Sequence, residues 1–315
     1  YTYFAEGDFI IAKITPCMEN GKCAIAEGLT NGIGFGSSEF HTFRCHASEI
    51  LTKFLFLLLN QTTVRKAAED AMTGASGHRR VPAAFYEEML IPVPPIPVQQ
   101  QVIDECAKID EEYNATRMSI ETYRQKTADL FAELDAVMST TEGNRLSLSD
   151  TEKFSVAIGK RVLDKELASN GTIPVYSANV TAPFGFIDKL LITDFSAPSV
   201  LWGIDGDWMT SYLPSDMPFY PTDHCGVLRC KNSEVNPRYL AHILEVEGRK
   251  MGFSRSYRAS IDRVHGIAFT VPDISIQNNA MSKVADYEMA IKELEGSLEK
   301  IASRRSEIIR KALAE

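Results

Sequence analysis

The sequence lacks the features that would place it in a membrane or an oxidising compartment. It has no run of about 18 apolar residues, and its most apolar stretch, residues 54–59, is far too short to span a bilayer. The cysteines form no CxxC pair and have poor zinc spacing, although His224 lies near two of them. We therefore expect free thiols in the reducing cytoplasm of a prokaryote. The six are Cys17, Cys23, Cys45, Cys106, Cys225 and Cys230.

Motifs of common enzymes are also missing. The sequence has no GxxxxGK[ST] phosphate loop, no GxSxG or HExxH, and no Asn/Asp-Pro-Pro-Tyr/Phe tetrapeptide of amino-methyltransferases. The glycine-rich run at residues 32–38 does not have dinucleotide-binding spacing, and we predict a turn-rich loop there. The six histidines are scattered. We expect no catalytic residues, no metal site and no cofactor bound by this chain.

A heptad pattern over residues 102–137 is the strongest positive signal. Mostly apolar residues recur there in alternating steps of four and three, separated by charged and polar residues. Prolines 94, 95 and 97 precede the pattern and Gly143 follows it, which predicts one helix roughly 60 Å long. So narrow an apolar stripe needs a partner helix. The seam positions are Val102, Cys106, Ile109, Tyr113, Thr116, Ile120, Tyr123, Thr127, Leu130, Leu134 and Val137.

The partner helix comes from an internal repeat. Segment 93–99 resembles segment 271–277, so that Gln99 corresponds to Gln277, and a second heptad seam follows in the same register. The same constant offset relates each of its positions to a position of the first seam, so we infer that one structural element is used twice. The second seam is Ala280, Val284, Tyr287, Ile291, Leu294, Leu298, Ile301, Arg305, Ile308 and Ala312.

The segments before each seam correspond as well. The matching pairs are segments 43–45 and 228–230, helix candidates 50–60 and 237–247, and Gly/Ser-rich loops 74–80 and 252–258. Short strands are expected at 9–14, 40–45, 200–202 and 226–230. The first copy has no counterpart of residues 146–182, and the chain begins with Tyr1 rather than Met. We therefore expect that an N-terminal part of the first domain is missing.

The repeat predicts an α+β fold in which two pseudo-repeated α/β domains are separated by two long helices packed as an antiparallel coiled coil. The expected divisions are 1–96, 97–142, 143–272 and 273–315, alternating domain and helix. Antiparallel packing would put the two globular domains at opposite ends of a rod. Parallel packing also satisfies the heptads, but its linker would have to run back along the rod.

Charge is distributed unevenly along the chain. The net charge is −9, which by itself argues against nucleic acid as a partner. Residues 97–142, however, contain four Lys and Arg against ten Asp and Glu, whereas residues 145–272 contain fourteen of each. The acidity therefore belongs to the first long helix, and the near-neutral globular parts are able to carry local basic patches.

Basic residues recur at the same point of both copies, in loops 74–80 and 252–258. Guanidinium and backbone N–H groups of such Gly/Ser-rich loops suit phosphates and guanine edges. Further basic groups flank the expected turn at residues 20–21 and occupy the loop at 159–161. A solvated surface charge would explain each one alone, but the recurrence favours DNA binding. The candidates are Lys13, Lys22, His78, Arg79, Arg80, Lys160, Arg161, Arg255, Tyr257 and Arg258.

Several segments together resemble the DNA-specificity subunits of type I restriction-modification systems. The resembling segments are 7–11, 34–40, 72–77, 80–82, 91–95, 99–100, 159–161 and 174–177. The step from Pro94-Pro95 to Gln99-Gln100 at the start of a long helix is the most specific feature. The second copy departs from it, with Pro272-Asp273 and Gln277-Asn278.

The resemblance implies two target recognition domains, each reading one half of a split site in double-stranded DNA, with the coiled coil fixing the gap between halves. It implies a non-catalytic subunit that carries two modification subunits, which are adenine-N6 methyltransferases using S-adenosylmethionine. It also implies restriction subunits that use ATP and Mg²⁺. Two other interpretations remain open. One is a coiled-coil adaptor that bridges other proteins without reading DNA, and the other is a fused methyltransferase-nuclease, against which the missing motifs argue.

Overall fold

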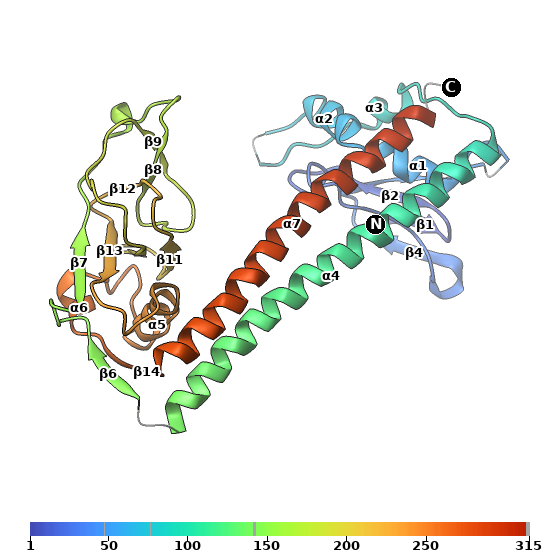
Figure 1. Ribbon diagram of the computed structural model, residues 1–315. Coiled ribbons are helices and arrows are strands. Elements are labelled where there is room, and N and C mark those ends of the chain that lie inside the picture. Colours follow the sequence, from blue (N-terminus) through green and yellow to red (C-terminus); the bar gives the residue numbers. More distant parts are fainter. Residues whose placement is uncertain (47, 76, 141–142, 313–315) are drawn as a thin grey trace. The chain divides into compact units, whose positions relative to one another are not determined.

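The computed structural model describes residues 1–46, 48–75, 77–140 and 143–312. It divides into two compact units, Tyr1–Glu121 with Lys292–Glu315 and Thr122–Ile291. We call these unit 1 and unit 2, and we call the globular part of each the first and the second domain. The division falls within the two long helices, so each unit holds one globular domain and a segment of each helix (Figure 1).

The two long helices are α4 (Ile96–Thr140) and α7 (Ile274–Ala312), with 45 and 39 residues. The predicted helical stretches extend to residues 142 and 315, and 141–142 and 313–315 lie outside the described residues. Helix α4 begins one residue before the predicted boundary at residue 97, so that Pro97 lies in its first turn. Proline is tolerated there because the N–H groups of a first turn have no partner within the helix.

Burial along both helices follows the seam positions. Between residues 107 and 129 of α4, the residues that are not exposed are Ile109, Tyr113, Thr116, Ile120, Tyr123 and Thr127, all of them seam positions. All ten seam positions of α7 are buried or half-buried. The α4 seam is shorter than predicted, because Leu134 is 4% exposed whereas Val137 is 38% exposed.

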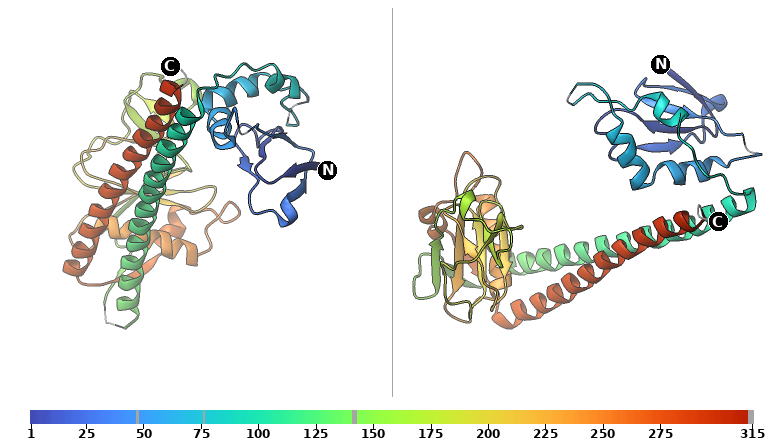
Figure 2. Two further views of the ribbon diagram at one scale, coloured as in Figure 1. Left: turned by 90° about the vertical axis from the view of Figure 1, so that its right-hand side faces the viewer. Right: turned by 90° about the horizontal axis from the view of Figure 1, so that it is seen from above.

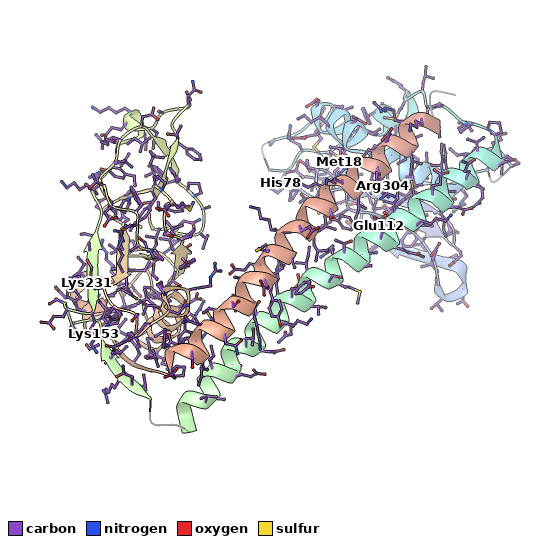
Figure 3. The ribbon with its side chains drawn as sticks, in the orientation of Figure 1. Met18, His78, Glu112, Lys153, Lys231 and Arg304 are labelled. Atoms are coloured by element: carbon purple, nitrogen blue, oxygen red, sulfur yellow. The ribbon has the colours of Figure 1, made fainter. Side chains whose placement is uncertain are left out.

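The helix segments run antiparallel within each unit (Figures 1 and 2). In unit 1, Asp110 pairs with Arg305 and Glu112 with Arg304, so numbers rise on α4 as they fall on α7. Figure 3 shows Glu112 and Arg304 facing each other across the two helices. Arg304 Nη1 lies 2.9 Å from Glu112 Oε2.

In unit 2, the rings of Tyr123 and Tyr287 lie 5.5 Å apart, and Leu134 shares an apolar cluster with Ala280 and Val284. The higher-numbered residue of α4 therefore again meets lower-numbered residues of α7. The predicted fold class, a mixed α and β structure with two long helices packed antiparallel, is confirmed.

The first domain packs short strands against helices. Its elements are β1 (Thr2–Ala5), β2 (Phe9–Ala12), β3 (Cys23–Ile25), η1 (Thr30–Gly32), β4 (Ile33–Gly36), β5 (Phe40–Phe43), α1 (Thr52–Leu59), α2 (Thr62–Asp70) and α3 (Ala83–Glu87). The sheets are β3-β2-β5 and β1-β4, both antiparallel. Phe9 and Ile11 of β2, almost fully buried, form a core with Leu55 and Leu59 of α1. Successive side chains of β2 point to opposite faces of the sheet, and α1 has an apolar face, which explains this packing.

The prediction of a turn-rich loop at residues 32–38 is wrong, because Ile33–Gly36 forms β4 and pairs with β1. A Cβ atom on Gly34 would lie 2.4 Å from the Phe4 ring, and one on Gly36 would lie 2.8 Å from the Phe40 ring. The glycines therefore let aromatic rings lie directly on the strand, a role that the composition of the run did not reveal.

The second domain has more strands and a larger core. Its elements are β6 (Asn144–Ser147), β7 (Phe154–Ile158), η2 (Asp164–Glu166), β8 (Ile173–Tyr176), β9 (Gly185–Ile187), β10 (Ser199–Gly203), β11 (Thr210–Leu213), β12 (Tyr220–Pro221), β13 (Cys225–Cys230), α5 (Pro237–Lys250), α6 (Ile261–His265) and β14 (Ala268–Val271). The sheets are β11-β10-β13-β7, β12-β8-β9 and β14-β6. Trp202 is fully buried, lies against Gly226, and donates from Nε1 to Ala259 O at 2.9 Å.

A buried glutamine ties each domain to the long helix that follows it. Gln99 is 0% exposed. Its Oε1 accepts from the N–H of Leu51, the N-cap residue of α1, at 2.8 Å. Its Nε2 donates to Glu49 O at 2.9 Å and to Pro94 O at 2.8 Å. The side chain therefore satisfies three backbone groups that come from both sides of the junction.

Gln277, the counterpart of Gln99 in the repeat, is also 0% exposed and has equivalent partners. Its Oε1 accepts from the N–H of Asn236, the N-cap residue of α5, at 2.9 Å. Its Nε2 donates to Glu234 O at 3.1 Å and to Pro272 O at 2.8 Å. We call each glutamine with its three backbone partners a glutamine junction. The repeat inferred from the sequence is thus visible in individual hydrogen bonds.

Candidate nucleic-acid interface

In the first domain, the structure brings Lys13 together with Arg79 and Arg80. The Val81 N–H donates to Lys13 O at 2.9 Å, and the Thr15 N–H donates to Arg79 O at 3.0 Å. The loop after α2 is thereby fixed beside the end of β2. Lys22 is exposed on the other side of the turn, where its carbonyl accepts from the Ala12 N–H.

Arg80 is held by a two-point ion pair with Glu39, the residue before β5. Arg80 Nε lies 2.8 Å from Glu39 Oε2, and Nη2 lies 2.9 Å from Oε1. Arg80 Nη1 also donates to His78 O at 2.9 Å. The hydrogen bond from Arg80 holds the pKa of the Glu39 carboxyl below its ordinary value, so the pair is ionised at neutral pH.

His78 and Arg79, the other two predicted residues of loop 74–80, are less constrained than Arg80. His78 is exposed, and its place in the loop is visible in Figure 3. Arg79 Nη2 lies 4.0 Å from Glu19 Oε1, at the limit of an ion pair, with 39% of its side chain exposed. These two side chains therefore keep their charge or hydrogen-bonding capacity available at the surface.

In the second domain, Arg258 is held in the same manner as Arg80. Its Nη2 donates to Asp205 Oδ2 at 2.9 Å, and its Nε contacts Asp205 Oδ1. His224 Nδ1 also forms a hydrogen bond with Asp205. The Asp205 carboxylate, in the loop after β10, thus has partners on two sides.

The rest of the second loop presents an aromatic surface and a further cation. Tyr257 is 38% exposed, and its ring stacks on Phe253 at a centroid distance of 5.8 Å. The Arg263 guanidinium lies 4.0 Å from the Tyr257 ring centroid, a cation–π geometry. Arg255 is exposed in the same loop. Arg263 was not among the predicted residues, because it lies in α6, outside the loop that the repeat singled out.

Lys160 and Arg161 are exposed directly after β7. The Lys160 N–H donates to Pro221 O at 3.1 Å. A Cβ atom on Gly159 would lie 1.8 Å from Pro221 O, so this close approach of two backbones requires glycine. Segment 221–225 also contains His224, the partner of Asp205, and so connects the Lys160 loop with the Arg258 cluster.

Other kinds of site find no support in the described part of the chain. Its residues include no group of three or more His, Cys, Asp or Glu side chains arranged to hold a metal ion. All six cysteines of the chain lie within the described ranges, and all six have free thiols. No helix within the described ranges combines the length and apolarity that a bilayer crossing requires.

Known structures share this fold. The S subunit of a type I restriction-modification system from M. genitalium gives a TM-score of 0.62 at 15% sequence identity, covering 99% of this chain and 84% of that one. A chain from a structural study of the assembly and conformational transition of the type I R-M system gives 0.57 at 15% identity, covering 99% and 83%. The fold is therefore that of a type I specificity subunit.

Sequence comparisons agree with the fold. Residues 151–302 match the type I restriction modification DNA specificity domain. Over 138 residues, the chain is 39% identical to the EcoAI specificity subunit and 36% identical to the EcoEI specificity subunit, both type I restriction enzymes of Escherichia coli. Each match covers 42% of this chain and 23% of the relative. Residues 151–302 are therefore similar to the DNA specificity domain of type I restriction-modification systems, and the predicted resemblance to type I specificity subunits is confirmed.

Proposed function

We propose that this chain reads a bipartite sequence in double-stranded DNA, one half with each globular domain. The observation that carries the proposal is the match of residues 151–302, the second domain with most of α7, to a DNA specificity domain. The first domain has the same glutamine junction and the same carboxylate-held arginine at the corresponding loop position. Two similar domains in one chain suit a target with two halves.

We further propose that the chain positions two adenine-N6 methyltransferase subunits, and restriction subunits with them. The exposed positions of α4 carry most of the acidic residues of the long helix, which makes them a poor surface for DNA but a suitable one for basic or polar protein partners. Under this proposal S-adenosylmethionine binds to the modification subunit, and ATP with Mg²⁺ binds to the restriction subunit. The chain itself contributes recognition and no catalytic residue.

The proposal is tested by co-expressing the chain with a modification subunit of a type I restriction-modification system and mapping N6-methyladenine in the host DNA. We expect methylation within one split motif of constant gap. Methylation without a sequence motif would contradict the proposal. So would DNA binding that remains independent of sequence at every salt concentration, since sequence-independent phosphate contacts alone weaken uniformly with salt. The adaptor interpretation predicts the latter result.

A further inference from the structure

Arg80 and Arg258 are held alike by carboxylates from unrelated elements. The two arginines occupy corresponding positions of the repeat, at the same offset that relates Gln99 to Gln277. Glu39 precedes β5, whereas Asp205 follows β10, so the repeat does not relate the two carboxylates to each other. In both pairs the carboxylate contacts Nε and Nη2 of the guanidinium. The feature that the two pairs share is therefore the two-point contact of a carboxylate with Nε and Nη2 of the guanidinium.

This two-point contact leaves N–H groups of Nη1 and Nη2 available on each guanidinium. An arginine has five N–H donors in a fixed plane. Because the carboxylate occupies the Nε–Nη2 side, one N–H on Nη2 and those on Nη1 remain, and Arg80 Nη1 gives one of its two to His78 O. Each guanidinium thus keeps at least one N–H donor on Nη1 and one on Nη2, and donors on these two nitrogens are the ones that bind O6 and N7 of guanine in the major groove.

The arginines are also accessible. Their side chains are 42% exposed for Arg80 and 57% exposed for Arg258. Neutralisation by the carboxylate reduces the attraction of each guanidinium for DNA phosphates at large, while the two-point contact limits its rotation. A base edge presenting two acceptors in one plane is the ligand that such a fixed and neutralised guanidinium selects best.

We propose that Glu39 and Asp205 are positioning residues that aim Arg80 and Arg258 at one guanine in each half-site. This inference rests on the proposed function and specifies it further. It predicts that the two carboxylates contribute sequence preference at the expense of general DNA affinity.

If the two ion pairs only held their loops in place, removing a carboxylate would unfold the loop, but backbone hydrogen bonds already fix both loops. The loop that carries Arg80 is fixed by backbone hydrogen bonds between residues 73 and 80, with N···O distances of 3.0 and 2.8 Å. The loop of Arg258 is fixed by the bond from the Ala259 N–H to Ile204 O at 3.1 Å. Replacing either carboxylate by its amide should therefore leave both domains folded.

The experiment selects binding sequences from a pool of random duplex DNA with the full chain, and compares wild type with Glu39→Gln and Asp205→Asn. The matched controls are Glu69→Gln and Glu247→Gln, which remove helix-surface carboxylates paired with Lys66 and Lys250. Selected motifs are then remade with 7-deazaguanine, which lacks N7, at single positions. Thermal unfolding of every variant is measured alongside.

We expect Glu39→Gln to lower the preference for guanine at one position of one half-site about tenfold, and Asp205→Asn to do so in the other half-site. Affinity for random duplex should rise at low salt, because a positive charge is released. 7-Deazaguanine at the affected position should weaken DNA binding by the wild type more than DNA binding by the variant. The controls should leave the motif unchanged.

Two results would overturn the inference while leaving the proposed function intact. One is a wild-type motif that neither amide variant alters. The other is a loss of preference spread evenly over a half-site together with a lower unfolding temperature, which would show that the pairs are structural. If the wild-type chain selects no motif at all, the proposed function itself fails and the inference fails with it.

Discussion

The two copies share the junction with the long helix but differ in the cores beside it. The glutamine junctions at Gln99 and Gln277 have matching backbone partners. The second domain, however, has one extensive core that includes both tryptophans, with two smaller clusters besides, whereas the buried residues of the first domain form only smaller clusters. A hydrogen-bonded junction depends on individual atoms, while an apolar core tolerates many combinations of side chains of suitable volume.

The segment before each long helix shows a second difference. In the second copy, β14 forms an antiparallel ladder with β6, and Phe269 of β14 is buried. The corresponding residues of the first copy, 90–93, form no strand in the described structure, and Leu90 there is 98% exposed. The first glutamine junction therefore fixes the start of its long helix without support from a strand ladder.

Among the features that the two copies share, the long helices should affect DNA binding most when they are changed, because we propose that they set the gap between the half-sites. Deleting one heptad from each helix, residues 116–122 and 294–300, keeps the seam in register. We expect affinity for the native split site to fall about 100-fold, because the two halves no longer bind together. A target with a changed gap should restore it. Selection of gap variants checks this, and an unchanged preferred gap would show that the helices do not set the spacing.

Replacing the junction glutamines would show whether the copies depend on them equally. Gln277→Leu and Gln99→Leu each leave buried backbone groups without partners, and we expect losses of about 3 kcal/mol or more in the free energy of unfolding. The loss should be greater for Gln99, whose junction lacks the strand ladder. Denaturant unfolding measures both. Gln100→Leu, an exposed neighbour bonded to Asp104, is the control and should change stability little.

Alanine at two ring-facing glycines would compare the rigidity of the cores. A Cβ atom on Gly226 would lie 2.0 Å from Trp202, which is fully buried and hydrogen-bonded and has no room to move. We expect Gly226→Ala to cost about 2–3 kcal/mol. Gly34→Ala meets the half-buried ring of Phe4 and should cost less. Equal losses in thermal unfolding would contradict this difference in rigidity.

A smaller difference should appear in the pH dependence of stability, through a half-buried histidine of the second domain. His242 in α5 stacks on Phe131 at a centroid distance of 3.9 Å, and burial lowers its pKa below 6.5, although nearby Asp135 opposes this effect. Its contribution to stability is present above the unfolded-state pKa and is lost as pH falls through the folded-state value, because the unfolded state binds the proton more readily. His242→Phe should remove this loss. Unfolding curves measured between pH 7 and 5 test it, and identical slopes for variant and wild type would refute it.

The sequence predicted features that depend on periodicity and missed those that depend on individual distant contacts. The seams, the repeat and most of α1 and α5 follow from spacing along the chain. The pairing of Arg80 with Glu39 joins residues 41 positions apart, and no local pattern signals it. The repeat and the family resemblance single out Gln99 without revealing its role, since that role depends on three backbone groups brought together by folding. The strand β4 was missed because glycine usually interrupts strands, and the Phe4 ring that requires glycine there comes from another strand.

The location of both tryptophans has a practical optical consequence. Trp202 and Trp208 are the only two in the sequence, and both lie in the core of the second domain. Emission excited selectively from tryptophan therefore reports on that domain alone, whereas far-ultraviolet circular dichroism is dominated by the long helices. If the two signals change together during denaturation, the domain and the helices unfold as one cooperative unit. If they separate, the order of the two transitions identifies the part that melts first.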